Sequence, residues 1–249
     1  MRFLAGAACA PSLAGCDQIT TYLASDETVE RLGLETWASL RQRVPVTRDA
    51  EARDRVANIA RRLLLAAGER PDEWELEVFA QPEANAFVLP GRKIGVFEGL
   101  LQVAEDDGEL AAVIGHEIGH LQAEHPRERV VAEMVRQGGL RLVSHLLQIN
   151  DVAFAQEIAG LLGVGAEFGL VRPFSRVQEL EADRLGLFLM AEAGYDPREA
   201  AELWRRMPQA SGRFSALLST HPAPQDRIEA IEALVPEAIE AATGDAPRR

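Results

Sequence analysis

Two histidines and a glutamate stand together in residues 108–129, which read GELAAVIGHEIGHLQAEHPRER. His116 and His120 are four residues apart, so on an α-helix they share one face and both imidazoles can reach one cation. Glu117 is rotated by about a hundred degrees from His116, and it can reach a water molecule on that cation. The three residues would supply two zinc ligands and a general base for hydrolysis. The same pattern also fits a helix with ordinary buried polar residues, so a third ligand has to decide.

The third ligand of such a site can come from two arrangements. In one, a histidine follows six residues after the second histidine with a glycine midway, but Pro126 and Ala123 occupy those positions. In the other, a second helix offers a glutamate and, four residues later, an aspartate. Residues 175–183, SRVQELEAD, match this second arrangement with Glu179 and Asp183. We therefore expect Glu179 to be the third ligand.

Asp183 has a separate predicted role on the same helical face. It can accept a hydrogen bond from Nδ1 of a ligating histidine, with His116 as the expected donor, and so fix the tautomer of that ring. Glu181 points to another side of the helix and is the competing ligand. The alternative for Glu179 and Asp183 is an ordinary solvated helix face.

These motifs together resemble a known family. HEIGH and SRVQELEAD, with NAFVLPGRKIGVFEGLL upstream and STHPAPQDRI downstream, are similar to the HtpX-like zinc metalloendopeptidases, whose relatives include the type I CAAX prenyl endopeptidase. The resemblance covers about residues 48–232. It implies a gluzincin: a mainly α (α+β) fold with a zincin-like core, a small antiparallel sheet beside the active-site helix, and one Zn²⁺ per chain. It also implies the soluble, envelope-facing lipoprotein branch, which acts on unfolded, misfolded or misassembled proteins.

Two residues of the downstream motif are further site candidates. His221, whose loop is stiffened by the following Pro222 and Pro224, could stabilise the oxyanion of the transition state. It could instead occupy the open zinc position at rest and move aside for substrate, or be an ordinary histidine near a helix start. Arg227 could anchor this loop through a carboxylate or a carbonyl, or it could be a surface charge.

The elements that must position these residues follow from the hydrophobic periodicity. Residues 48–68 form an amphipathic helix, and residues 73–80 and 85–99 read as three strands of a small antiparallel sheet. The motif helix begins near Asp106 or Asp107 in a capping-box-like start, and Pro126 interrupts it. Helices are also expected within residues 17–47 and over five later segments, namely 127–148, 151–170, 175–193, 197–206 and 222–242. Gly115 and Gly119 are unfavourable in a helix, which predicts close approach of the sheet or a substrate there.

One strand, the segment between the two ligand helices and two further histidines each allow more than one interpretation. The strand that starts at Asn85, with Ala86, Phe87 and Val88, would bind an extended substrate if it lies at an edge of the sheet, although it could also be internal. Residues 127–171 would form either a mobile lid or plain core packing. His125 and His145 are expected to be structural or solvent-facing.

Composition excludes some classes of function. The 249 residues carry a net charge of -13, which argues against nucleic-acid binding, and 47% of them are hydrophobic, as in a globular protein. Both cysteines, Cys9 and Cys16, lie near the start, so any metal in the body of the chain must bind histidine and carboxylate.

The N-terminal residues predict a membrane anchor. Residues 1–15 read as a lipoprotein signal peptide, and Leu13-Ala14-Gly15-Cys16 resembles a lipobox in which Cys16 is acylated. The alternative is an ordinary buried N-terminal segment. A lipid on Cys16 would place the protein on a bacterial envelope membrane, facing the periplasm; a soluble periplasmic or cytoplasmic location is the alternative.

The predicted domain organisation follows from these segments. Residues 16–47 form a polar and helical lead-in, residues 48–242 the metallopeptidase domain, and residues 243–249 a disordered tail. Its expected partners are unfolded or misassembled proteins and a membrane surface. The sequence does not determine the oligomeric state.

Three functions compete at this point. The first is a metalloendopeptidase in which Glu117 accepts a proton from water and donates it to the leaving amine. The second is a chaperone-like or self-inhibited binding protein whose zinc site is gated by His221. The third is a structural zinc site, which three ligands with an adjacent glutamate argue against, because structural sites close with a fourth protein ligand.

Overall fold

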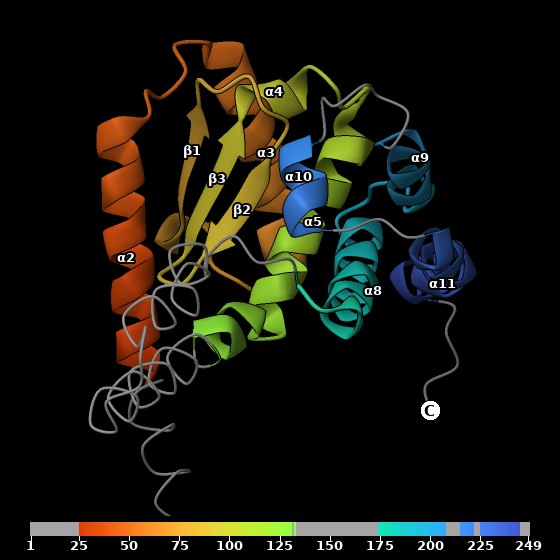
Figure 1. Ribbon diagram of the computed structural model, residues 1–249. Helices are drawn as coiled ribbons and strands as arrows, with labels where there is room; N and C mark the ends of the chain where they lie inside the picture. The colour runs from red at the N-terminus through yellow and green to blue at the C-terminus, as the bar shows by residue number, and fades with distance from the viewer. Residues whose placement is uncertain (1–24, 131, 133–173, 208–214, 222–224, 245–249) are drawn as a thin grey trace, which may run out of the picture.

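The computed structural model describes residues 25–130, 132, 174–207, 215–221 and 225–244, and these are mainly helical around one three-stranded sheet (Figure 1). The predicted mainly α class with a small sheet is confirmed. The described elements are α2 (Asp26–Arg43), α3 (Ala50–Ala66), the 3₁₀ turn η1 (Pro71–Glu73), β1 (Glu75–Phe79), β2 (Ala86–Leu89), β3 (Lys93–Phe97), α4 (Glu98–Leu101), α5 (Asp107–Gln122), α8 (Arg176–Glu192), α9 (Arg198–Arg206), α10 (Ser215–Thr220) and α11 (Gln225–Thr243).

Several predicted features lie outside the described residues. They are the signal peptide with Cys16, most of the proposed lid with His145, and residues 245–249 of the proposed tail. Among the described helices, none is both long enough and apolar enough to cross a membrane.

The sheet is mixed and not purely antiparallel, which corrects the prediction. Its strand order is β1-β3-β2, with β1 parallel and β2 antiparallel to β3. The chain leaves β1, passes the position of the central strand, and returns through the turn at Pro90-Gly91-Arg92 to place β3 in the middle. Alternation of polar and apolar residues predicts which residues form strands, but it carries no information on strand order or direction.

Helices cover both faces of this sheet. On one face, Trp37 of α2 meets the ring of Phe79 edge-on at 5.6 Å between centroids. On the other face, apolar residues of all three strands join α3 and α5 in the main hydrophobic core. β2 is an edge strand of this described sheet and lies beside α5. The sheet therefore holds the motif helix along its edge strand.

Helix α5 starts as predicted but ends earlier. The Asp106 carboxylate caps it by accepting a hydrogen bond from the backbone N–H of Glu109 at 2.9 Å. The helix stops at Gln122, four residues before Pro126, in a turn where Glu124 has a φ of 57°. Residues 125–130 are helical again, with Pro126 in their first turn. Proline is well tolerated there because the first N–H groups of a helix have no intrahelical partner, so Pro126 starts a helix and does not break one.

Glycines allow α5 and α8 to approach closely. A methyl group on Gly186 of α8 would lie 2.7 Å from the backbone nitrogen of His116, and one on Gly119 would lie 2.7 Å from the carbonyl oxygen of Ala182. The glycines of the motif helix therefore face another helix; the prediction of a sheet or substrate beside them is wrong. This close approach brings the histidines of α5 to the carboxylates of α8.

Replacing Gly186 with alanine should destabilise the protein by about 1–3 kcal/mol, because the new methyl would overlap backbone atoms that cannot rotate away. Urea unfolding of the metal-free protein measures this. Gly108→Ala is the control, since its methyl would come closest to the side chain of Glu199, which can shift more easily than backbone. Equal stability of the Gly186 variant and the parent would contradict close backbone contact between the two helices.

The other helices complete the support of α8. Ser175 and Gln178 form a capping box at its start, and α11 packs along it and also contacts α9. α8 is therefore held between α5 and α11.

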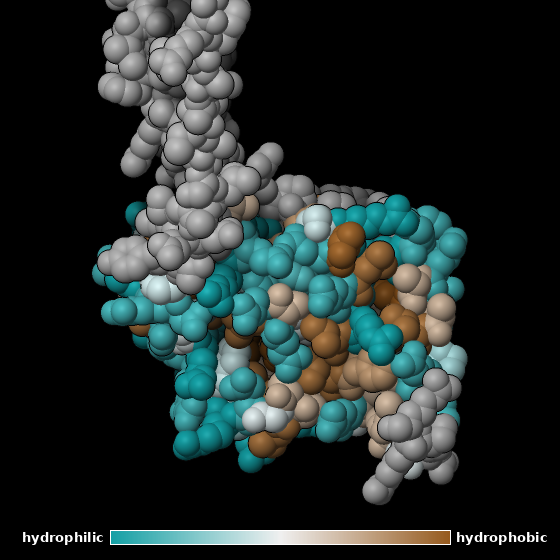
Figure 2. Space-filling view, turned by 90° about the horizontal axis from the view of Figure 1, so that it is seen from below, coloured by the Kyte–Doolittle hydropathy of each residue, from teal (hydrophilic) through white to brown (hydrophobic). Residues whose placement is uncertain are grey.

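Seen from below in Figure 2, hydrophilic side chains cover most of the described surface, and hydrophobic ones gather in one area.

Candidate metal centre

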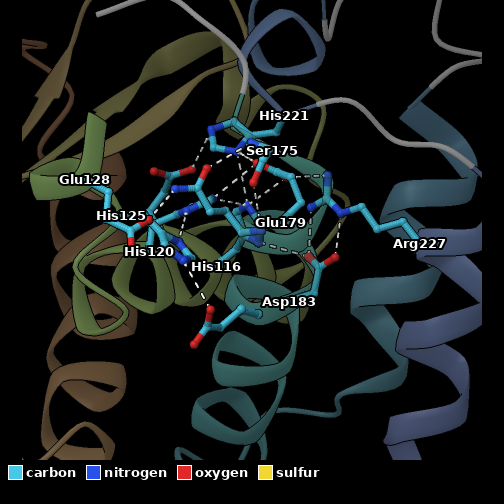
Figure 3. Close-up of polar contacts among 12 residues, drawn as sticks. His116, His120, His125, Glu128, Ser175, Glu179, Asp183, His221 and Arg227 are labelled. Atoms are coloured by element: carbon cyan, nitrogen blue, oxygen red, sulfur yellow. Dashed lines mark hydrogen bonds and ion pairs between the residues drawn. The ribbon is translucent and has the colours of Figure 1, made fainter. Parts of the chain in front are cut away.

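The predicted ligands meet in one buried cluster. Nε2 of His116 and Nε2 of His120, both on α5, lie 3.0 Å apart. Glu179 of α8 places Oε1 3.4 Å from His120 Nε2 and Oε2 3.5 Å from His116 Nε2. All three side chains are at most 5% exposed, and Figure 3 shows them pointing toward one another. The structure thus brings the predicted third ligand to the two histidines.

His221 joins this cluster from the residue after α10. Its Nδ1 lies 3.0 Å from Glu179 Oε1 and 3.1 Å from His116 Nε2, and its Nε2 lies 3.2 Å from Glu117 Oε1. The side chain is 4% exposed. This burial and these contacts argue against the interpretation of His221 as an ordinary histidine near a helix start.

The cluster fits a divalent cation. Zinc binds nitrogen and oxygen at about 2.0–2.1 Å, so neighbouring ligand atoms around a tetrahedral ion lie about 3.3 Å apart. Ligand atoms of His116, His120, Glu179 and His221 all lie within 4.8 Å of one another. In addition, Glu117 Oε1 and Glu179 Oε2 are buried beside charged groups without an aligned hydrogen bond. Lone pairs that converge this closely repel unless a proton or a metal ion lies between them, and four such residues could hold one metal ion.

Burial and charged neighbours shift the pKa values of the side chains in the cluster. Burial alone would raise the pKa of Glu179, but contacts with His116, His120 and His221 outweigh burial and lower it. Burial would lower the pKa of His116, yet hydrogen bonding to Asp183 and Glu179 raises it to about 9. Burial and the charge of His116 lower the pKa of His120 to about 2. Glu179 is therefore anionic, and His120 is a neutral ring with a lone pair to donate.

Asp183 lies where the sequence placed it. Its Oδ1 is 2.9 Å from Nδ1 of His116, so it can hold the ring with Nε2 toward the cluster. Burial would raise the pKa of Asp183, but hydrogen bonds from Arg227 and His116 lower it. Arg227 is itself buried and bonded to Asp183 at 2.5 Å through Nε. Arg227 therefore binds a carboxylate, which was one of its two predicted roles. The alternative, an exposed surface charge, is wrong.

His125 was not recognised as part of the site. It is 2% exposed, and its Nδ1 lies 2.9 Å from Nδ1 of His120, while its Nε2 lies 3.4 Å from Glu181. His125 can therefore accept a hydrogen bond from His120 as Asp183 does from His116. Glu181, the competing ligand, reaches His125 with a side chain that is 56% exposed. A spacing of five residues turns His125 off the metal face of a continuous helix; only the turn after Gln122 returns it.

Phe174 is a second residue that the sequence did not single out. Its ring stacks on His120 with centroids 3.9 Å apart, and the guanidinium of Arg129 lies 3.7 Å from the centroid of Phe174. Phe174 thus covers one side of the cluster.

The predicted substrate strand lies at the sheet edge. β2 contains Ala86, Phe87 and Val88 and pairs within the described residues with β3 alone, and the Asn85 carbonyl accepts from Phe97 N–H at 2.9 Å. Ala86 and Val88 point into the core, and Asn85 and Phe87 are partly exposed. The edge position agrees with that prediction; binding of substrate there stays a prediction.

Comparison with known proteins also indicates a metallopeptidase. The sequence model of peptidase family M48 matches residues 49–235. The chain is 40% identical over 187 residues to the mitochondrial metalloendopeptidase OMA1 of Schizosaccharomyces pombe, covering 74% of this chain and 53% of that protein. It is 41% identical over 155 residues to OMA1 of Arabidopsis thaliana, covering 62% and 30%. It is 27% identical over 237 residues to the putative beta-barrel assembly-enhancing protease of Vibrio cholerae, covering 89% and 49%.

The match spans most of this chain but a smaller part of its relatives, between 30% and 53% of the length of these three proteins. The range matched by the family model, residues 49–235, includes both α5 and α8. The chain therefore belongs to peptidase family M48, a family of zinc metallopeptidases.

Proposed function

We propose that the chain is an endopeptidase that cleaves unfolded or misassembled proteins, with zinc held by His116, His120 and Glu179. The observation that carries this proposal is the buried convergence of these three side chains from α5 and α8 next to Glu117. When bound, zinc would polarise the peptide carbonyl and lower the pKa of a water molecule.

The roles of the chain's own residues follow from their positions. Glu117 would accept a proton from the attacking water and deliver it to the leaving amine. Its Oε1 lies 3.2 Å from His221, so base and histidine face the same space. Asp183 and His125 would hold the two ligand imidazoles in the tautomer that presents Nε2 to the metal. Asn85 to Val88 at the sheet edge would pair with the backbone of an extended substrate, which gives low sequence selectivity.

His221 supports a related, self-inhibited state. Its Nδ1 lies as close to His116 and Glu179 as those residues lie to one another, which supports a role as a fourth ligand at rest. In that case His221 would move aside when substrate enters, and it could then stabilise the oxyanion. If His221 stayed on the metal permanently, the chain would instead be a binding protein of chaperone type.

The location of the activity is a further part of the proposal. Two relatives are named as beta-barrel assembly-enhancing proteases of Vibrio cholerae and Yersinia pestis. Together with the lipobox-like residues that end at Cys16, these names support a periplasm-facing lipoprotein of the envelope, in the HtpX-like branch, that acts on envelope proteins. Acylation of Cys16 would provide a membrane anchor.

Cleavage of a permanently unfolded protein by the purified chain tests the activity. We expect internal cleavage products by mass spectrometry, their loss after chelation, and their return when zinc is added. A protein that binds zinc and yet leaves unfolded chains intact would favour the closed, binding-only state over the endopeptidase.

A further inference from the structure

Arg227, in the first turn of α11, is the largest fully buried side chain of the described residues, at 1% exposed. A buried guanidinium is costly unless charged partners surround it. Here Nε and Nη2 donate to Asp183 Oδ2 and Oδ1 at 2.5 and 2.8 Å, a bidentate pair. Nη1 lies 2.6 Å from Glu179 Oε2, and the ring of Trp204 lies 3.8 Å from the guanidinium carbon. The cation is thus fixed on three sides.

The two oxygens of Glu179 consequently have different neighbours. Oε1 faces the ring nitrogens of His221 and His120 at 3.0 and 3.4 Å, inside the ligand cluster. Oε2 is turned toward Arg227, which is much nearer at 2.6 Å than His116 Nε2 at 3.5 Å. Figure 3 shows Arg227 reaching toward Glu179 and Asp183 from the right. Arg227 therefore competes with an ion for Oε2, whereas Oε1 faces the ring nitrogens of the cluster.

We propose that Arg227 is a positioning residue that keeps Glu179 a one-oxygen ligand and so leaves a coordination position for water and substrate. This inference rests on the proposed zinc site. Without the guanidinium, Glu179 would be free to turn both oxygens toward the ion, and Asp183 would lose the partner that holds it against His116. Arg227 also ties the placement of α11 to the geometry of the metal centre.

Lysine cannot replace this arginine, although it keeps the charge. An ammonium is a compact point charge on a flexible stem and cannot donate in parallel to Asp183 while it contacts Glu179. The expected order of effect is therefore Arg227→Met largest, Arg227→Lys intermediate. Arg184→Met is the matched control, because Arg184 joins the same two helices through Glu237 at 3.3 Å but is exposed.

The test uses the full chain loaded with Co²⁺, whose visible absorption weakens when the coordination number rises. We expect Arg227→Met to reduce the absorbance per bound Co²⁺ by about twofold or more and to weaken zinc binding by about 10- to 100-fold, as other changes to groups that hold ligands do. Arg227→Lys should shift both in the same direction, and Arg184→Met should change neither. If the methionine variant does not fold, the lysine variant decides alone.

Two failures are distinguishable. Parent-like spectra and affinities in the Arg227 variants that fold, with a parent that binds both metals, would overturn this role of Arg227 and leave the zinc site intact. A parent chain that binds neither Zn²⁺ nor Co²⁺ would overturn the proposed function as well.

Discussion

Replacing Glu117 with glutamine is expected to lower the rate of peptide hydrolysis by about 10²–10⁴-fold while zinc stays bound. Glutamine keeps the size of the side chain, but its amide cannot accept the proton of the attacking water at neutral pH. Glu117 is 5% exposed and lies beside the cluster. It is not one of the four residues whose possible metal-ligand atoms converge. The measurements are the initial rate of cleavage of an unfolded protein and the zinc content of the same sample.

Glu124→Gln provides the matched control for this variant, since Glu124 is an exposed glutamate seven residues later in the chain. It should cleave at the rate of the parent. Hydrolysis by the Glu117 variant at a rate equal to that of Glu124→Gln would show that another group acts as the base.

Replacing Glu179 with glutamine should weaken zinc binding by about 100-fold or more, a larger effect than changes behind the ligands produce. The variant should also lose about 3 kcal/mol of stability without metal, because Arg227 and His116 would keep their buried positions and lose an anionic partner. Chelator competition measures the affinity, and urea unfolding of the metal-free protein measures the stability.

Glu181→Gln is a sharp control for Glu179, because it lies two residues away on the same helix and was the competing ligand. Its side chain is 56% exposed, and its Oε2 lies 3.4 Å from His125 Nε2. We expect stability within about 0.5 kcal/mol of the parent and much the smaller effect on zinc. A greater loss of zinc in the Glu181 variant would reverse the assignment of the third ligand.

The sequence predicted the positions of the ligands because helical periodicity fixes which residues share a face. His116 and His120, and separately Glu179 and Asp183, are each four apart, and the two pairs meet as expected. Both helix starts were also predictable, since Asp106 and Ser175 cap them with short polar side chains.

Other features depend on contacts between distant segments, which periodicity does not encode. The parallel pairing of β1 with β3 depends on the path of the connecting chain. The role of Gly186 depends on which helix crosses α5, and His125 returns to the site only because α5 ends at Gln122. Arg227 looked like a possible surface charge because a lone arginine in a helical segment gives no sign of burial.

The central claim is tested most directly by locating zinc in a crystal of the metal-loaded protein. Anomalous scattering at the zinc absorption edge gives its position. The account predicts one ion per chain, about 2.0–2.2 Å from Nε2 of His116, Nε2 of His120 and one carboxylate oxygen of Glu179. An ion bound elsewhere, or one bonded to the histidines with Glu179 beyond bonding distance, would contradict it.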